Sequence, residues 1–188
     1  MRMKKRFFVC AILAILISLM CQMTFAYFTT TVTAENVITA GGIQIELYQK
    51  NASGEDIKDP NGIMPGHDLN WITTVKNLQD DAYVRVKVEA KIVREDGAEA
   101  VAEGDALSEI LAIDFNTTDW TEQDGIWYYN TPVTANEVTK PLFEKVSFNT
   151  NMPNEYQGVS ISLNVQAQAT QVANNGTGVL TAAGWPEF

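Results

Sequence analysis

The chemistry available to this sequence begins with His67, its only histidine, which lies in the turn-like segment Met64-Pro65-Gly66-His67-Asp68. A zinc peptidase needs two histidines one helical turn apart and a glutamate base, and a serine hydrolase needs a base beside its nucleophile. The chain contains neither HExxH nor GxSxG, and it has no glycine-rich loop of a phosphate-binding type. We therefore interpret His67 as a solvated turn residue and predict that the protein is not an enzyme and holds no cofactor.

Loops rich in carboxylates are a second candidate, because such loops hold calcium outside cells. The clusters are Glu55, Asp56 and Asp59 with Asn61, then Glu95 with Asp96, and then Asp114 with Asp119. Their spacing does not match an EF-hand, so we favour solvated acidic loops and predict no metal site.

An aromatic cluster raises the alternative of a carbohydrate-binding face. It consists of Trp120, Trp127, Tyr128 and Tyr129. Aromatic side chains that alternate along strands are more often part of a core or a sheet surface, and we favour that interpretation. Glycosylation sequons occur at Asn51, Asn116 and Asn175. A monomeric surface-binding module for glycan or calcium stays open as an alternative function.

The first 26 residues have the organisation of a secretory signal. Four basic residues among the first six precede the uncharged stretch Phe7–Met20, and Thr24-Phe25-Ala26 offers small residues at a cleavage site between Ala26 and Tyr27. An uncleaved anchor is the alternative, but the apolar stretch is shorter than the roughly 20 residues of a spanning helix. Lipid attachment at Cys21 is not expected, because the residues before it do not fit a lipobox. We predict a secreted protein without a stable membrane anchor after cleavage.

Composition after the cut limits the classes of partner. Both cysteines, Cys10 and Cys21, lie in residues 1–26, so the remaining 162 residues contain no thiol and must be stabilised by a packed core. These residues carry nine Lys and Arg against 23 Asp and Glu, which gives a formal charge of -14. Such a charge makes nucleic acid an improbable partner. One domain is expected for this length, because about 150 residues bury roughly 70% of their unfolded surface.

Period-two alternation of apolar and polar residues is the main structural signal. It is clearest over 83–92 and 159–170, each typical of a strand with one buried and one wet face. Shorter candidates lie at 28–33, 37–40, 43–48, 69–76, 111–115, 126–129 and 142–148. We predict an all-β fold over residues 27–172, a jelly-roll-like antiparallel β-sandwich of about eight or nine strands. Residues 173–188, which end in a small apolar cluster around Trp185, are interpreted as a flexible tail that either stays loose or docks back onto the domain.

The segment that would begin the mature chain is uncharged and β-prone. It reads Tyr27, Phe28, Thr29, Thr30, Thr31, Val32 and Thr33, and five of its seven residues are β-branched. A free strand of this kind either completes the sheet of its own molecule or inserts along the edge of a neighbour. The second arrangement does not close and so produces fibres. The residues alone leave both interpretations open.

Three blocks of the sequence are similar to those of a known family. They are Thr24-Phe25-Ala26-Tyr27-Phe28 leading to 38–47, then Met64-Pro65-Gly66-His67-Asp68-Leu69 with Asn77 and 81–88, and finally Asn154-Glu155-Tyr156-Gln157-Gly158 leading to 169–171. With these blocks the chain resembles, over nearly its whole length, the TasA and camelysin (CalY) family of Gram-positive matrix proteins, which the signal peptidase SipW processes.

The resemblance implies a secreted jelly-roll subunit of the cell surface or biofilm matrix. TasA-like members form fibres by donating their N-terminal strand to the next subunit, so residues 27–33 are the expected donor and an exposed groove between the sheets the expected acceptor. Its partners would be further copies of itself, related matrix subunits and a SipW-type signal peptidase. Because the chain is shorter than TasA, an accessory or capping subunit is one alternative. A camelysin-like surface metallopeptidase is disfavoured, because HExxH is absent.

Overall fold

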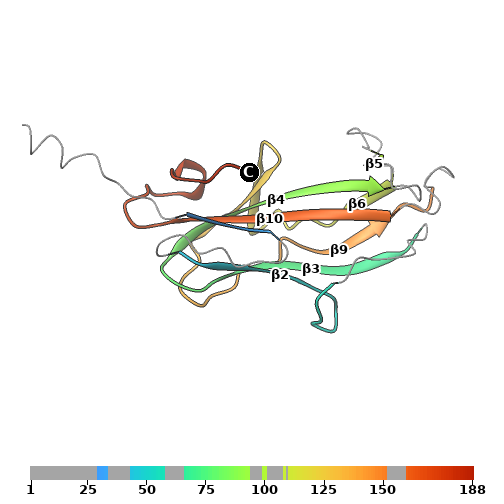
Figure 1. Cartoon of the computed structure of the whole chain (residues 1–188), viewed down its shortest axis with the longest axis horizontal. Helices are drawn as coiled ribbons and strands as arrows, with labels where there is room; N and C mark the ends of the chain where they lie inside the picture. The colour runs from blue at the N-terminus through green and yellow to red at the C-terminus, as the bar shows by residue number, and fades with distance from the viewer. Residues whose placement is uncertain are drawn as a thin grey trace, which may run out of the picture.

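The computed structural model describes residues 29–33, 43–57, 66–93, 99–100, 108, 110–151 and 160–188. Within these ranges the chain forms ten β-strands in two antiparallel sheets (Figure 1). The predicted cleavage site at Ala26 and Tyr27, together with Phe28, lies outside the described residues, as does the expected strand at 37–40. No helix in the described part of the chain is long and apolar enough to cross a membrane.

The larger sheet has six strands in the described residues. Its order is β1 (Thr29–Thr33), β10 (Ser160–Gln171), β4 (Ala82–Val93), β8 (Ile126–Tyr129) and β7 (Trp120–Gln123), with β5 (Glu99–Ala100) paired beside β4. The four-stranded sheet has the order β2 (Ile45–Lys50), β3 (Asp68–Asn77), β9 (Phe143–Phe148) and β6 (Leu111–Ile113).

The core lies between the two sheets. Alternate residues of β4 and β10 point inward, among them Val84, Val86 and Val165, and they join Val75 of β3 and Phe143 of β9 in one buried cluster. Burial of this apolar surface is the main stabilising contribution in a chain of this kind. The prediction of an all-β antiparallel sandwich is therefore confirmed.

Two strands of the larger sheet, β5 and β7, are not among those predicted from the sequence. β7 pairs with β8 across the two-residue turn Asp124-Gly125, whose φ angles are 54° and 77°. Two successive positive φ angles define the tight hairpin turn that Asp-Gly favours. This dipeptide is the sequence signal that points to β7.

The outer face of β4 and β10 departs from the expected wet surface. Tyr83 and Arg85 of β4 are only 3% and 9% exposed, and Gln168 and Thr170 of β10 are fully buried. Arg85, Gln168 and Thr170 are contacted by residues 172–188, which we call the strap and which Figure 1 shows in dark red over the larger sheet. The strap includes the short 3-10 helix η2 (Val179–Thr181). We expected a flexible tail here, and the structure instead places the segment against the sheet through specific side-chain contacts.

Candidate functional site

The candidate assembly site is the edge of the larger sheet formed by β1. All five residues of β1 pair antiparallel with β10, from Thr29 opposite Thr170 to Thr33 opposite Gln166. Among the described residues β1 is the last strand at this edge, and it also contacts β2 of the other sheet. In Figure 1 it is drawn in blue beside β10. Five of the seven residues predicted as the donor thus lie in an edge strand of their own molecule.

β10 offers β1 a long and regular partner. It pairs over twelve residues with β4 on its other side, and its inward residues Val165, Ala167 and Ala169 are fully buried. Without β1, the outward backbone N–H and C=O groups of residues 166–170 would lose their strand partner. Unpaired edge groups of this kind are a template for another strand. The described geometry therefore fits either occupant, the strand of the same chain or that of another copy.

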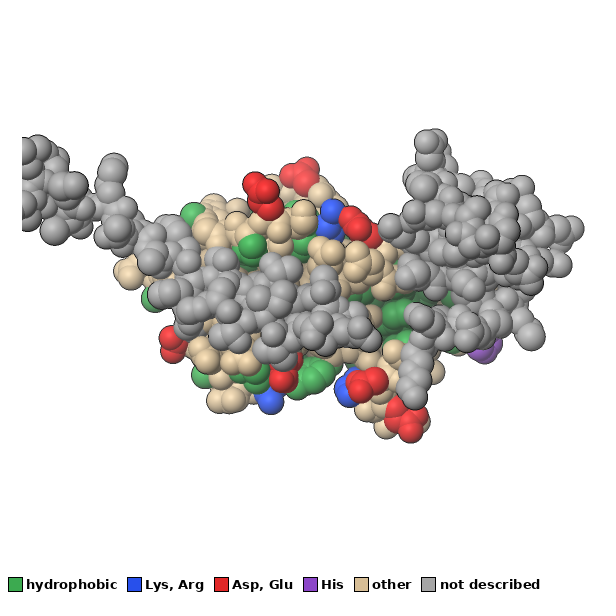
Figure 2. Space-filling view, viewed as in Figure 1, with side chains coloured by type: hydrophobic (Ala, Val, Ile, Leu, Met, Phe, Trp, Pro, Cys, Tyr) green, Lys and Arg blue, Asp and Glu red, His purple; other side chains and the backbone are tan. Residues whose placement is uncertain are grey.

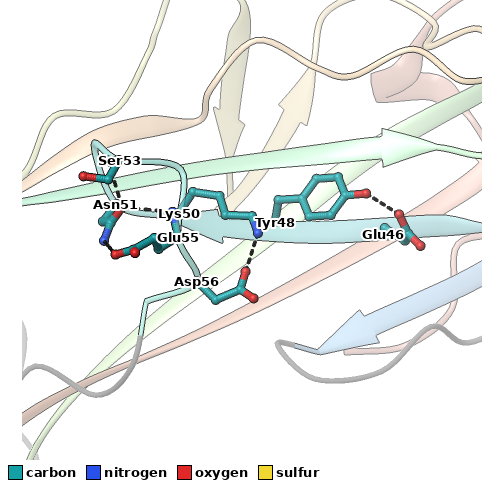
Figure 3. Close-up of polar contacts among 7 residues, drawn as sticks. All are labelled: Glu46, Tyr48, Lys50, Asn51, Ser53, Glu55 and Asp56. Atoms are coloured by element: carbon teal, nitrogen blue, oxygen red, sulfur yellow. Dashed lines mark hydrogen bonds and ion pairs between the residues drawn. The ribbon is translucent and has the colours of Figure 1, made fainter.

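The acidic loops do not converge on a metal site. After β2 the chain turns back at residues 51–55, and Asp56 forms an ion pair of 2.5 Å with Lys50 (Figure 3). Glu55 accepts a hydrogen bond from the side-chain amide of Asn51. In the part of the chain that the structure describes, no three His, Cys, Asp or Glu side chains gather to hold a metal ion. Asp59, Asn61, Glu95 and Asp96 lie outside that part.

The second described acidic loop uses its carboxylates to fix the backbone. Asp114 accepts hydrogen bonds from the backbone N–H groups of Glu144 and Lys145, at 3.0 and 2.7 Å. Asp119 accepts one from the side-chain amide of Asn116 at 2.9 Å. Both carboxylates therefore have structural partners inside the domain.

The aromatic cluster mostly belongs to the core. Trp120 is 1% exposed, and Trp127 and Tyr129 pack against the buried cluster. Trp127 also stacks on Phe115, with ring centroids 4.4 Å apart. Tyr128 faces the other way, and its ring meets Trp185 of the strap edge-to-face. These contacts leave no open aromatic platform for a sugar among these four side chains.

His67 and its neighbour Asp68 are exposed at the start of β3. The backbone carbonyl of His67 accepts a hydrogen bond from Phe148, and Asp68 pairs with Lys145 at 3.2 Å. A hydrogen bond from the Ser147 side chain, and then Lys145, lowers the pKa of Asp68. These contacts join the start of β3 to β9.

Other shifted groups are also explained by local contacts. Glu46, Tyr48 and Lys50 alternate along β2 and lie on its outer side (Figure 3). The Tyr48 hydroxyl donates to Glu46, and this hydrogen bond, more than burial, raises the pKa of Tyr48. Two hydrogen bonds from Thr134 lower the pKa of Glu137.

Comparisons with known proteins give no match, because no family model, no curated protein and no solved structure is similar to this chain at a significant level. The resemblance to the TasA and camelysin family rests on the sequence motifs given above. What it implies is carried forward as a proposal.

Proposed function

We propose that this protein is a secreted structural subunit of an extracellular biofilm matrix or cell-surface fibre. A SipW-type signal peptidase cleaves it between Ala26 and Tyr27, and the subunits assemble by exchange of the N-terminal donor strand, residues 27–33. Its role is structural and not catalytic. The observation that carries the proposal is the place of β1 at the edge of the sheet, where β10 is its one neighbouring strand among the described residues.

Backbone pairing makes such an exchange nearly neutral in free energy. The contact of β1 with β10 is a ladder over five residue pairs, and a ladder of the same register is available to the β1 of another copy. Swapping one identical element for another leaves the number of pairs unchanged and adds a link between molecules. A row of such links in one direction does not close, so it grows into a fibre.

The charge distribution supports assembly through this strand. The 162 residues after the cut have a formal charge of -14, and acidic side chains outnumber basic ones on the face shown in Figure 2. Copies of the subunit therefore repel one another over distances up to about the Debye length, roughly 8 Å at physiological salt. A contact made by an uncharged strand avoids adding to this repulsion.

The order of the strands supports a jelly roll as the finer description of the sandwich. The chain passes from the four-stranded sheet (β2, β3) to the larger sheet (β4), returns at β6, and crosses again between β8, β9 and β10. Repeated crossing between two sheets is typical of jelly rolls and Greek keys. In this arrangement β1 and β10, from opposite ends of the domain, meet at one edge.

Electron microscopy of residues 27–188 beside residues 34–188 tests the proposal. Fibres are expected only from the longer chain. A sharper pair of variants is Val32→Pro and Val32→Ile in the longer chain, because Val32 pairs with Ala167 and proline cannot donate to a ladder. The proline variant should fold and stay unassembled, whereas the isoleucine variant should form fibres.

Three outcomes contradict the proposal and point elsewhere. Fibres from residues 34–188 would show that another segment makes the contact. Monomers from both chains, with binding of a glycan or calcium, would favour the surface-binding module. Casein cleavage that persists through repurification and stops with a chelator would favour the metallopeptidase.

A further inference from the structure

The strap has two parts with different anchors. Residues 172–183 form a loop held by Asn175, and residues 185–188, which we call the tetrapeptide, lie on Arg85. Gly184 joins them with a φ of 73°. A positive φ is strained for residues with a side chain, so this glycine sets the direction in which the tetrapeptide leaves the loop.

Asn175 fixes the loop to the end of β10. Its side chain is 2% exposed, and its amide nitrogen donates to the Thr170 hydroxyl at 3.0 Å, the Gln171 carbonyl at 2.8 Å and the Ala183 carbonyl at 3.0 Å. Its amide oxygen accepts from the backbone N–H of Ala183 at 2.7 Å. Both the NH₂ group and the carbonyl oxygen of one buried amide are thus used to close this loop.

The tetrapeptide is held by cation–π contacts and hydrogen bonds to its backbone. The Arg85 guanidinium carbon lies 4.7 Å from the ring centroids of both Trp185 and Phe188. Arg85 donates to the carbonyl of Pro186 at 2.7 Å and to the side chain of Gln168 at 2.8 Å. Gln168 in turn donates to the carbonyl of Glu187 at 3.1 Å. Arg85 and Gln168 therefore form a built site for this peptide on the outer face of the sheet.

The same residues of β10 carry both the strap and β1. Gln168 binds the tetrapeptide through its side chain while its backbone pairs opposite Thr31. Thr170 donates its hydroxyl to the carbonyl of Ala183 in the strap and pairs opposite Thr29. Anything that orders these two residues from the outer face also orders the ladder that β1 needs.

We propose that the strap controls how firmly β10 holds β1, so that release of the tetrapeptide promotes exchange of β1 between copies of this chain. The first half concerns a single molecule, and only the second half rests on the proposed function. The tetrapeptide is the part suited to release, because its partners are outward-facing side chains on one sheet and its hinge is a single glycine. The Asn175 loop keeps the released peptide near its site.

Hydrogen–deuterium exchange on residues 27–188 tests the first half. Deleting residues 185–188, or replacing Trp185→Ala, should make the amides of residues 29–33 exchange about tenfold faster, because local opening follows the loss of nearby contacts. The amides of β2 should keep their protection, which reports that the sandwich remains folded. Leu180→Ala is the matched control, since Leu180 lies in the strap, is 48% exposed and is outside the tetrapeptide.

Fibre elongation by the same variants separates this inference from the proposed function. Faster exchange at 29–33 with faster elongation supports both. If the variants exchange faster at 29–33 but neither they nor the unaltered chain form fibres, the result supports control of β1 by the strap and contradicts donor-strand assembly. Unchanged exchange at 29–33 in a folded deletion variant overturns the inference, even if fibres form. Equal loss of protection in β1 and β2 overturns it as well, because the effect would then be global.

Discussion

The outer faces of the two sheets differ, although both come from strands with the same alternating pattern. On the larger sheet the outward residues Arg85, Gln168 and Thr170 are buried and in contact with the strap. On the four-stranded sheet the outward residues of β2 are half-buried, and Asp68 of β3 is exposed. Alternation therefore indicates which residues face the core, but it does not indicate whether the other face meets water or a further segment.

The difference also separates two ways of holding a segment on β10. β1 is held along the edge by backbone pairing, which depends little on side-chain identity. The strap is held across the face by particular side chains, each with a defined partner. Backbone pairing suits exchange between identical copies, whereas side-chain anchoring suits a contact that is specific to its own sequence.

Asn175→Ala should produce the largest effect on the covered face. The substitution removes all the hydrogen bonds of the buried amide and leaves the partner groups at Ala183 without them. Loss of a buried hydrogen-bonded group lowers the free energy of unfolding by about 1–3 kcal/mol. Urea unfolding followed by tryptophan fluorescence measures this change, and hydrogen exchange should rise over residues 175–188.

Asn130→Ala serves as the control, because Asn130 is also a turn amide but is exposed and bonds to Thr118 and Thr121. It should change the free energy of unfolding by less than about 0.5 kcal/mol, as surface substitutions usually do. If both variants had equal effects, the Asn175 loop would not be a special anchor, and the contrast between the two faces would lose its main support.

Thr73→Val tests the inner face of the four-stranded sheet, where the Thr73 hydroxyl group is buried. Thr73 is fully buried, and its hydroxyl has no hydrogen-bond partner among the described residues. Valine has nearly the same shape and removes the unpaired oxygen, so we expect stabilisation of about 1 kcal/mol. Thermal unfolding measures the shift. Thr170→Val is the opposing control, and it should destabilise because the Thr170 hydroxyl is bonded to Asn175 and Ala183.

The sequence was sufficient for the elements whose pattern is repeated over many residues. β4 and β10 were predicted from alternation alone, and β8 was predicted with its observed bounds. For the tail the sequence left docking open but did not predict the contacts of the strap, because they join residues far apart in the chain, such as Arg85 and Pro186. The available signal was an arginine in the middle of a polar strand face together with aromatic residues in the tail.

The role of the candidate site residues also depends on contacts that a short motif does not predict. The three sequon asparagines look like surface acceptors in the sequence, yet Asn175 is 2% exposed and its side chain closes a loop. Asn51 and Asn116 use their side-chain oxygens to fix the turns that follow them. Short motifs describe composition, whereas burial and hydrogen bonding depend on what the fold brings beside them.

Asp68→Asn should give the smallest effect, because the Asp68–Lys145 pair joins β3 and β9 on the exposed face. The hydrogen bond from Ser147, and then the contact with Lys145, lowers the pKa of Asp68 in the folded protein from its ordinary value of 3.8, so the ionised carboxylate stabilises the fold above that value. This contribution is lost as the pH falls below the ordinary value and through the lowered pKa. Urea unfolding at several pH values should therefore show wild type slightly more stable than the variant near neutral pH and equal to it in acid. As a control, Glu144→Gln removes a charge from β9, the strand of Lys145. A pH-independent difference for Asp68→Asn would show that the carboxylate acts by packing and not by its charge.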